Sequence, residues 1–91
     1  MLEAVKLALR IMPDQAAFDG EIEDLIEAAL ADLRLVGVSK PDCEDPLIKR
    51  AVVTYCKANF GFDNPDADRL RLSYHLLRDH LSLAEGYGYA L

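Results

Sequence analysis

Residues 45–61 are the stretch that most constrains the fold of this chain. Asp45 can accept hydrogen bonds from the free N–H groups of a first helical turn, and Pro46 follows where its missing donor costs nothing. Gly61 comes after the expected last helical residue, at a position where a left-handed cap needs no side chain. Between these caps the main apolar face comprises Leu47, Ile48, Ala51, Tyr55 and Ala58, with Val52 and Cys56 widening it. A helix that is apolar over most of its circumference has to be covered on most sides, so we expect it to be the central helix of a small bundle.

Two segments before it also have helical periodicity. A short first helix is expected over residues 2–11, because Pro13 excludes helical geometry from the residue before it. A second helix is expected over residues 19–36, with Asp19 at its start and Gly37 as its stop. Its core stripe comprises Ile22, Leu25, Ile26, Ala29, Leu30, Leu33 and Val36.

A last helix is expected to have Asp63 or Asn64 as its cap and Pro65 in its first turn, and to reach about Leu83. Its core stripe comprises Ala67, Leu70, Tyr74, Leu77 and Leu81. The predicted fold is therefore all-α, a small four-helix bundle with a nearly fully apolar central helix. We expect one domain over residues 1–84 and a flexible C-terminal tail over residues 85–91, because 91 residues cannot divide their apolar surface between two cores.

Composition and motif spacing argue against several classes of function. Ten basic and sixteen acidic residues give a net charge of −6, which disfavours a general affinity for nucleic acid. Cys43 and Cys56 lack metal-ligand spacing and are expected to be free thiols of a cytoplasmic protein. His75 and His80 lie about 140° apart on a helix and cannot share a metal as an i, i+4 pair does. With no catalytic motif, signal peptide or long apolar run, we expect neither an enzyme nor a cofactor nor a membrane segment.

The predicted helices carry more apolar surface than one small bundle can cover. On the last helix, Leu72, Leu76 and Leu83 fall roughly opposite the core stripe. On the second helix, a weaker outer stripe comprises Ala28, Ala31 and Leu35. Contiguous apolar patches of this kind usually mark a partner surface. The alternatives are that the last helix is enclosed by its own bundle, or that the leucines are exposed singly.

Charge points to the same kind of contact. Residues 19–35 contain six acidic residues and one arginine, a net charge of −5, whereas residues 45–62 contain three bases and one acid, a net charge of +2. An acidic face carrying Glu23 and Glu27 could meet a basic strip of Lys49, Arg50 and Lys57 head-to-tail between copies, and such contacts can close into rings. The alternative is a solvated helix whose first-turn acids match its dipole.

Residues 85–91 contain Tyr87 and Tyr89 in alternation with glycine, ending in Leu91. In an extended segment both rings project on one side, which suits docking on another protein. Disorder in the free protein is the alternative, and the two are compatible if the segment orders on binding.

The order and spacing of the motifs resemble a known family. The sequences LEAVKLALRI at 2–11, EIEDLIEAAL at 21–30, DPLIKRAV at 45–52 and NFG at 59–61 are similar to those of the small head–tail connector proteins of tailed bacteriophages. These are also called adaptor or DNA-packaging proteins, and prophage copies are common. The similarity runs from residue 2 to about residue 83.

The resemblance implies a structural subunit of the virion neck, assembled in the host bacterial cytoplasm. Copies would form an oligomeric ring beneath the portal protein that extends the DNA channel and docks the next neck or stopper protein. It assigns Tyr87, Tyr89 and Leu91 to portal binding and makes residues 38–44 a candidate for the tail-facing side. DNA would pass a negatively charged lumen without specific binding. The alternative from the residues themselves is a small helical DNA-binding regulator that uses Lys49, Arg50 and Lys57.

Overall fold

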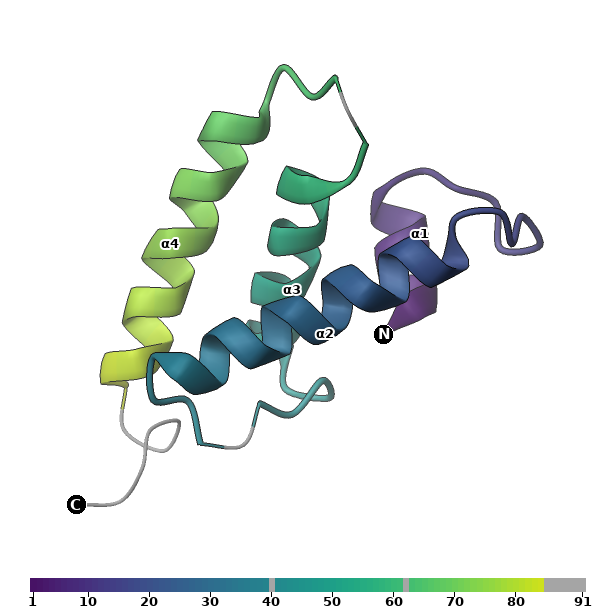
Figure 1. Ribbon diagram of the computed structural model, residues 1–91. Coiled ribbons are helices and arrows are strands. Elements are labelled where there is room, and N and C mark those ends of the chain that lie inside the picture. The colour runs from purple at the N-terminus through teal and green to yellow at the C-terminus, as the bar shows by residue number, and fades with distance from the viewer. Residues whose placement is uncertain (40, 62, 85–91) are drawn as a thin grey trace.

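The computed structural model describes residues 1–39, 41–61 and 63–84. Within these ranges the regular structure consists of α1 (Leu2–Ala8), α2 (Asp19–Leu35), α3 (Pro46–Asn59) and α4 (Ala67–Leu83) (Figure 1). The predicted all-α fold is confirmed, and each of the four predicted segments contains a helix. The predicted tail, residues 85–91, lies outside the described residues.

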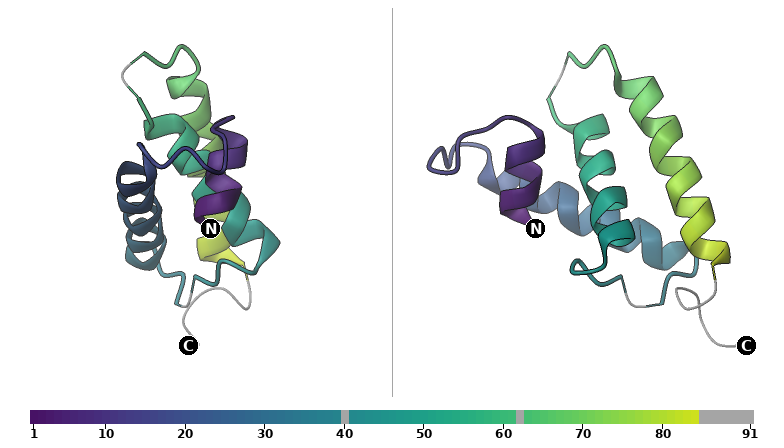
Figure 2. Two further views of the ribbon diagram at one scale, coloured as in Figure 1. Left: turned by 90° about the vertical axis from the view of Figure 1, so that its right-hand side faces the viewer. Right: turned by 180° about the vertical axis from the view of Figure 1, so that it is seen from behind.

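The helices form two layers. α3 and α4 run antiparallel and side by side, and α2 crosses one face of this pair (Figure 1). Viewed from the edge, α2 lies on one side of the molecule, and α1, α3 and α4 lie on the other (Figure 2, left). α3 packs against each of the other three helices, so its predicted central position is confirmed.

The start and end of α3 follow from local chemistry. A carboxylate oxygen of Asp45 accepts hydrogen bonds from the backbone N–H groups of Leu47 at 2.8 Å and Ile48 at 3.3 Å. Gly61 adopts the predicted left-handed conformation, with φ of 82°. Leu47 differs from the prediction, because it is 48% exposed at the first turn rather than part of the core. The buried side chains of α3 are Ile48, Ala51, Val52, Cys56 and Ala58.

α1 ends at Ala8, three residues before the predicted end at residue 11. Arg10 adopts a left-handed conformation with φ of 62°, and its N–H donates to the Leu7 carbonyl at 3.1 Å. The N–H of Ile11 donates to the Lys6 carbonyl at 2.9 Å. These two bonds are the Schellman pattern of helix termination. The helix therefore stops through its own backbone before Pro13 can act.

The C-terminal end of α2 is confirmed at Gly37, which has φ of 98°. The N–H of Val38 donates to the Leu33 carbonyl at 3.0 Å, and the N–H of Gly37 donates to the Arg34 carbonyl at 3.1 Å, again in the Schellman pattern. Val38 and Leu33 are both buried, which supplies the apolar contact that accompanies this motif. At the other end the N-cap residue is Phe18, without a side-chain cap bond.

α4 begins at Ala67 with Asp66 as its N-cap residue, so Pro65 precedes the helix and does not lie in its first turn as predicted. The Asn64 side chain forms the preceding turn, because its Oδ1 accepts from the Asp66 N–H at 3.0 Å. The Nδ2 of Asn64 donates to the Lys57 carbonyl at 2.7 Å, which ties the start of α4 to the end of α3. The predicted core stripe of α4 is confirmed in its C-terminal part, where Tyr74 and Leu81 are buried and Leu77 is partly buried against the core. Ala67 and Leu70, at the start of the helix, are only half-buried.

Candidate assembly surfaces

An apolar ridge runs along the outer side of α4. Leu72, Leu76 and Leu83 are 61%, 56% and 87% exposed. They lie on turns opposite the buried residues Tyr74 and Leu81, as the helical periodicity predicts. We call these three leucines the α4 ridge. The predicted exposure of the ridge is confirmed, and its role in a contact stays a prediction.

One basic side chain of α3, that of Arg50, lies beside Leu76 of this ridge. Arg50 and Leu76 line the same surface cavity, of about 180 Å³, together with Ser73, Leu77 and His80. Lys49, Arg50 and Lys57 are all exposed. The structure therefore brings one residue of the basic strip next to one leucine of the α4 ridge, a contact that the sequence alone does not give.

The outer face of α2 forms a second surface in the other layer. Leu35 is 85% exposed, and Ala28 and Ala31 are also exposed. Glu23 and Glu27 are exposed on the same helix. This face has a small apolar stripe with carboxylates along it, opposite in charge to the surface that α3 and α4 form.

A hydrogen-bonded cluster that the sequence analysis missed fixes α4 against α2. The Tyr74 hydroxyl donates to Asp32 at 2.6 Å, and an Arg78 guanidinium nitrogen lies 3.3 Å from the same carboxylate oxygen. The Tyr55 and Tyr74 rings meet edge to face with centroids 5.1 Å apart. Burial, and next the hydrogen bond to Asp32, raise the pKa of Tyr74 well above its ordinary value. The only sequence signal is the polar edge that Asp32 and Arg78 give to their helices.

A second missed cluster fixes α1. Lys6 is only 4% exposed, although lysine side chains are almost never fully buried unless they are paired. Its Nζ donates to the carbonyls of Pro13 at 3.1 Å and Gln15 at 2.7 Å, and it lies 2.8 Å from a carboxylate oxygen of Asp19. A buried ammonium needs this set of partners, since an unpaired charge inside a protein is costly. The cluster holds the loop between α1 and α2 in place.

The end of the molecule around α1 also exposes apolar side chains, which the sequence analysis did not single out. Leu7, Met12 and Phe18 are 79%, 65% and 40% exposed. The Phe18 ring packs edge to face on Phe60, with centroids 5.4 Å apart, which anchors one of the three. The short length of α1 hides this surface from a periodicity argument.

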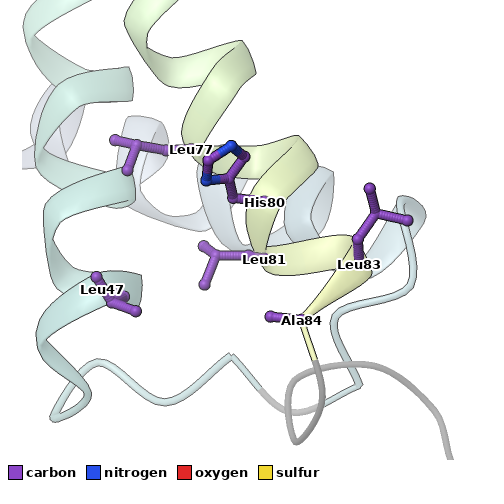
Figure 3. Close-up of a pocket in the computed structure, with 6 residues that line it drawn as sticks. All are labelled: Leu47, Leu77, His80, Leu81, Leu83 and Ala84. Atoms are coloured by element: carbon purple, nitrogen blue, oxygen red, sulfur yellow. The ribbon is translucent and has the colours of Figure 1, made fainter.

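An apolar groove lies between the start of α3 and the end of α4. Its volume is about 410 Å³, and it is lined by Leu47, Leu77, His80, Leu81, Leu83 and Ala84. In Figure 3 the side chains of Leu77, Leu81 and Ala84 extend from α4 toward the side of Leu47. The half-exposed Leu47 noted above forms the α3 wall of this groove.

The histidines, cysteines and acidic side chains of the described residues do not gather into a metal site. No group of three His, Cys, Asp or Glu side chains in them could hold a metal ion. His75 and His80 are both exposed. Cys43 and Cys56 are free, and burial raises the pKa of the Cys56 thiol to about 12, so this thiol stays protonated at neutral pH.

Two further observations concern membrane-spanning helices and the predicted C-terminal tail. None of the helices that the structure describes has the length and apolar character needed to span a bilayer. The residues predicted to bind the portal, Tyr87, Tyr89 and Leu91, lie outside the described residues.

Comparison with known protein families gives a match. The sequence model of a family described as phage connector protein matches residues 1–88, which is nearly the whole chain. Searches of curated proteins and of solved structures gave no significant match.

Proposed function

The chain belongs to the phage connector protein family, and from this premise we propose that copies of it form a ring that joins the portal to the next protein of the neck. Connectors of this family are structural proteins of the phage particle. The ring would extend the DNA channel below the portal. DNA would pass through it without specific binding.

The proposal rests on the presence of two different surfaces with complementary charge, one in each layer of the subunit. One combines the α4 ridge with the exposed bases of α3; the other combines the outer stripe of α2 with its carboxylates. Because they differ, a contact between them is head-to-tail, and repetition of one rotation closes a ring. The proposed interface comprises Glu23, Glu27, Ala28, Ala31, Leu35, Lys49, Arg50, Lys57, Leu72, Leu76 and Leu83.

The two kinds of residue have different roles in this interface. The leucines supply affinity, since each removes apolar surface from water on contact, roughly 25 cal/mol per Å². The charged side chains at the edges favour one pairing of surfaces over others, because like charges brought together are penalised. Portal docking is assigned to Tyr87, Tyr89 and Leu91, and the ring provides the platform for the neck protein.

Charge reversal tests the interface. We expect the double substitution Glu23→Lys and Glu27→Lys to reduce assembly strongly. Light scattering measures assembly of the isolated protein, and electron microscopy measures it in the presence of the portal protein. The matched control is Glu3→Lys with Asp14→Lys, which changes net charge equally on exposed residues near α1. Adding Lys49→Glu, Arg50→Glu and Lys57→Glu to the first variant should restore assembly.

Each outcome of this test is decisive. Unchanged assembly in the Glu23 and Glu27 variant, or equal loss in the control, would contradict the proposed pairing of surfaces. A gel-shift titration at low salt covers the alternative function. Firm binding of duplex DNA by the isolated protein would favour a DNA-binding regulator, and a connector should give none.

A further inference from the structure

We propose that the apolar groove between α3 and α4 is the seat of the chain's own residues 85–91 in the free subunit. The groove is distinct from the α4 ridge and from the basic strip, except that Leu83 belongs to both the ridge and the groove wall. Its occupant is a segment of the same subunit, rather than of a second copy.

The lining of the groove determines what it can hold. Four of the six lining residues are leucines, and His80 is the one with a titratable side chain. Leu47 and Leu83 are 48% and 87% exposed. A concave surface of this composition takes an apolar or aromatic side chain with a polar tip, as tyrosine has.

The position of the groove selects the occupant. Ala84 is both a lining residue and the last residue before the segment, so residue 85 starts at the edge of the groove. The N–H of Ala84 still bonds to the His80 carbonyl at 2.9 Å, but its ψ of 136° is extended, so the chain leaves the helix there. Seven residues span at most about 23 Å, which covers a groove two helical turns long.

The sequence of the segment fits the groove. In an extended conformation alternate side chains share one face, which places Tyr87, Tyr89 and Leu91 together. The glycines at 86 and 88 let the backbone approach the groove closely. Because the segment is tethered at the rim, binding within the subunit closes only a short loop and is favoured over capture by a neighbour.

The segment contains Tyr87, Tyr89 and Leu91, to which the proposed function assigns portal binding. That assignment rests on the proposed function, whereas the seat itself concerns the isolated subunit. A test on the isolated subunit can therefore fail while ring formation stands, and the reverse.

The test uses the full chain with methyl-labelled leucines in solution NMR. We expect nuclear Overhauser contacts from the Tyr87 and Tyr89 rings to the methyl groups of Leu47 and Leu77, unchanged on dilution. Tyr87→Ser with Tyr89→Ser should abolish the contacts and shift these methyl resonances. The methyl groups of Leu72, on the ridge, should not shift.

A groove variant provides the reciprocal test. Leu47→Asp changes a half-exposed residue, so we expect the fold to survive, as circular dichroism will check. This variant should lose the tyrosine contacts, and Leu72→Asp should keep them. Absence of contacts in the natural chain would overturn the proposal. Contacts that vanish on dilution would also overturn it, since the occupant would then be a second copy.

Discussion

α3 and α4 lie side by side but divide their surfaces differently. α3 has 14 residues, buries five side chains and packs against every other helix. α4 has 17 residues and buries two, while three of its leucines are more than half exposed. The comparison teaches that apolar content alone does not locate the core. Side chains of one kind hold the fold together in α3 and remain available for a partner in α4.

The largest expected difference between the two helices is in the loss of stability when a large apolar side chain is shortened to alanine. Ile48→Ala in α3 should lower the free energy of unfolding by about 3 kcal/mol, because it leaves a cavity in a fully buried site. Leu76→Ala in α4 should change it by less than about 0.5 kcal/mol, because the side chain is exposed. Urea denaturation of the two variants measures both values. Similar losses would break the comparison.

High pH should lower stability through a buried ionisable group on each of the two helices. Burial raises the pKa of Cys56 in α3 from 9.0 to about 12, so the unfolded state loses this proton first. The stabilisation is therefore complete below pH 9 and is lost as pH rises toward 12, at up to about 1.4 kcal/mol per pH unit. Cys56→Ala should make the fall in stability between these pH values shallower.

Tyr74 in α4 contributes to the same fall, because its pKa is also raised. Tyr74→Phe therefore serves as the matched variant for the α4 side, and the double variant should show the shallowest curve. Chemical denaturation at several pH values above 9 measures the slopes. A slope that neither substitution changes would contradict the burial of both groups.

The smallest expected difference is in the loss of stability when the N-cap residue of each helix is replaced by alanine. Asp45→Ala should cost about 1 kcal/mol, because it removes two cap hydrogen bonds from α3. Asp66→Ala should cost roughly 0.3 kcal/mol, because Asp66 makes no side-chain cap bond and contributes only an exposed ion pair with Arg69 and its charge near the helix start. Thermal unfolding of the two variants compares them directly. Equal costs would show that the two starts do not differ.

The same contrast explains how much of the fold could be predicted. Caps and stops that depend on neighbouring residues, such as Asp45, Gly61 and Gly37, were predicted correctly, since their chemistry is local. The end of α1 was predicted wrongly because Arg10 takes a left-handed conformation that the residue type rarely adopts. The start of α4 was misplaced because Asn64 bonds to the Lys57 carbonyl of the preceding helix.

The candidate surfaces divide along similar lines. Helical periodicity predicted the exposure of the α4 ridge, because a period of 3.6 fixes which residues oppose a core stripe. It could not place Arg50 beside Leu76, or form a groove from Leu47 and Leu81, because these pairs depend on how two helices pack. The buried Lys6 was missed for the same reason, since all its partners come from later in the chain.

The distribution of partners along α2 has one more consequence. Asp19 is paired with Lys6 and Asp32 with Arg78, so the acids near both ends of the helix are engaged inside the subunit. Arg34 is exposed near the C-terminal end. The acids left facing outward sit in the N-terminal half and comprise Glu21, Glu23, Asp24 and Glu27. The electrostatic energy of a basic partner surface is therefore lowest when that surface faces the N-terminal half of α2. The charge distribution of the helix thus fixes the position of a partner along its length.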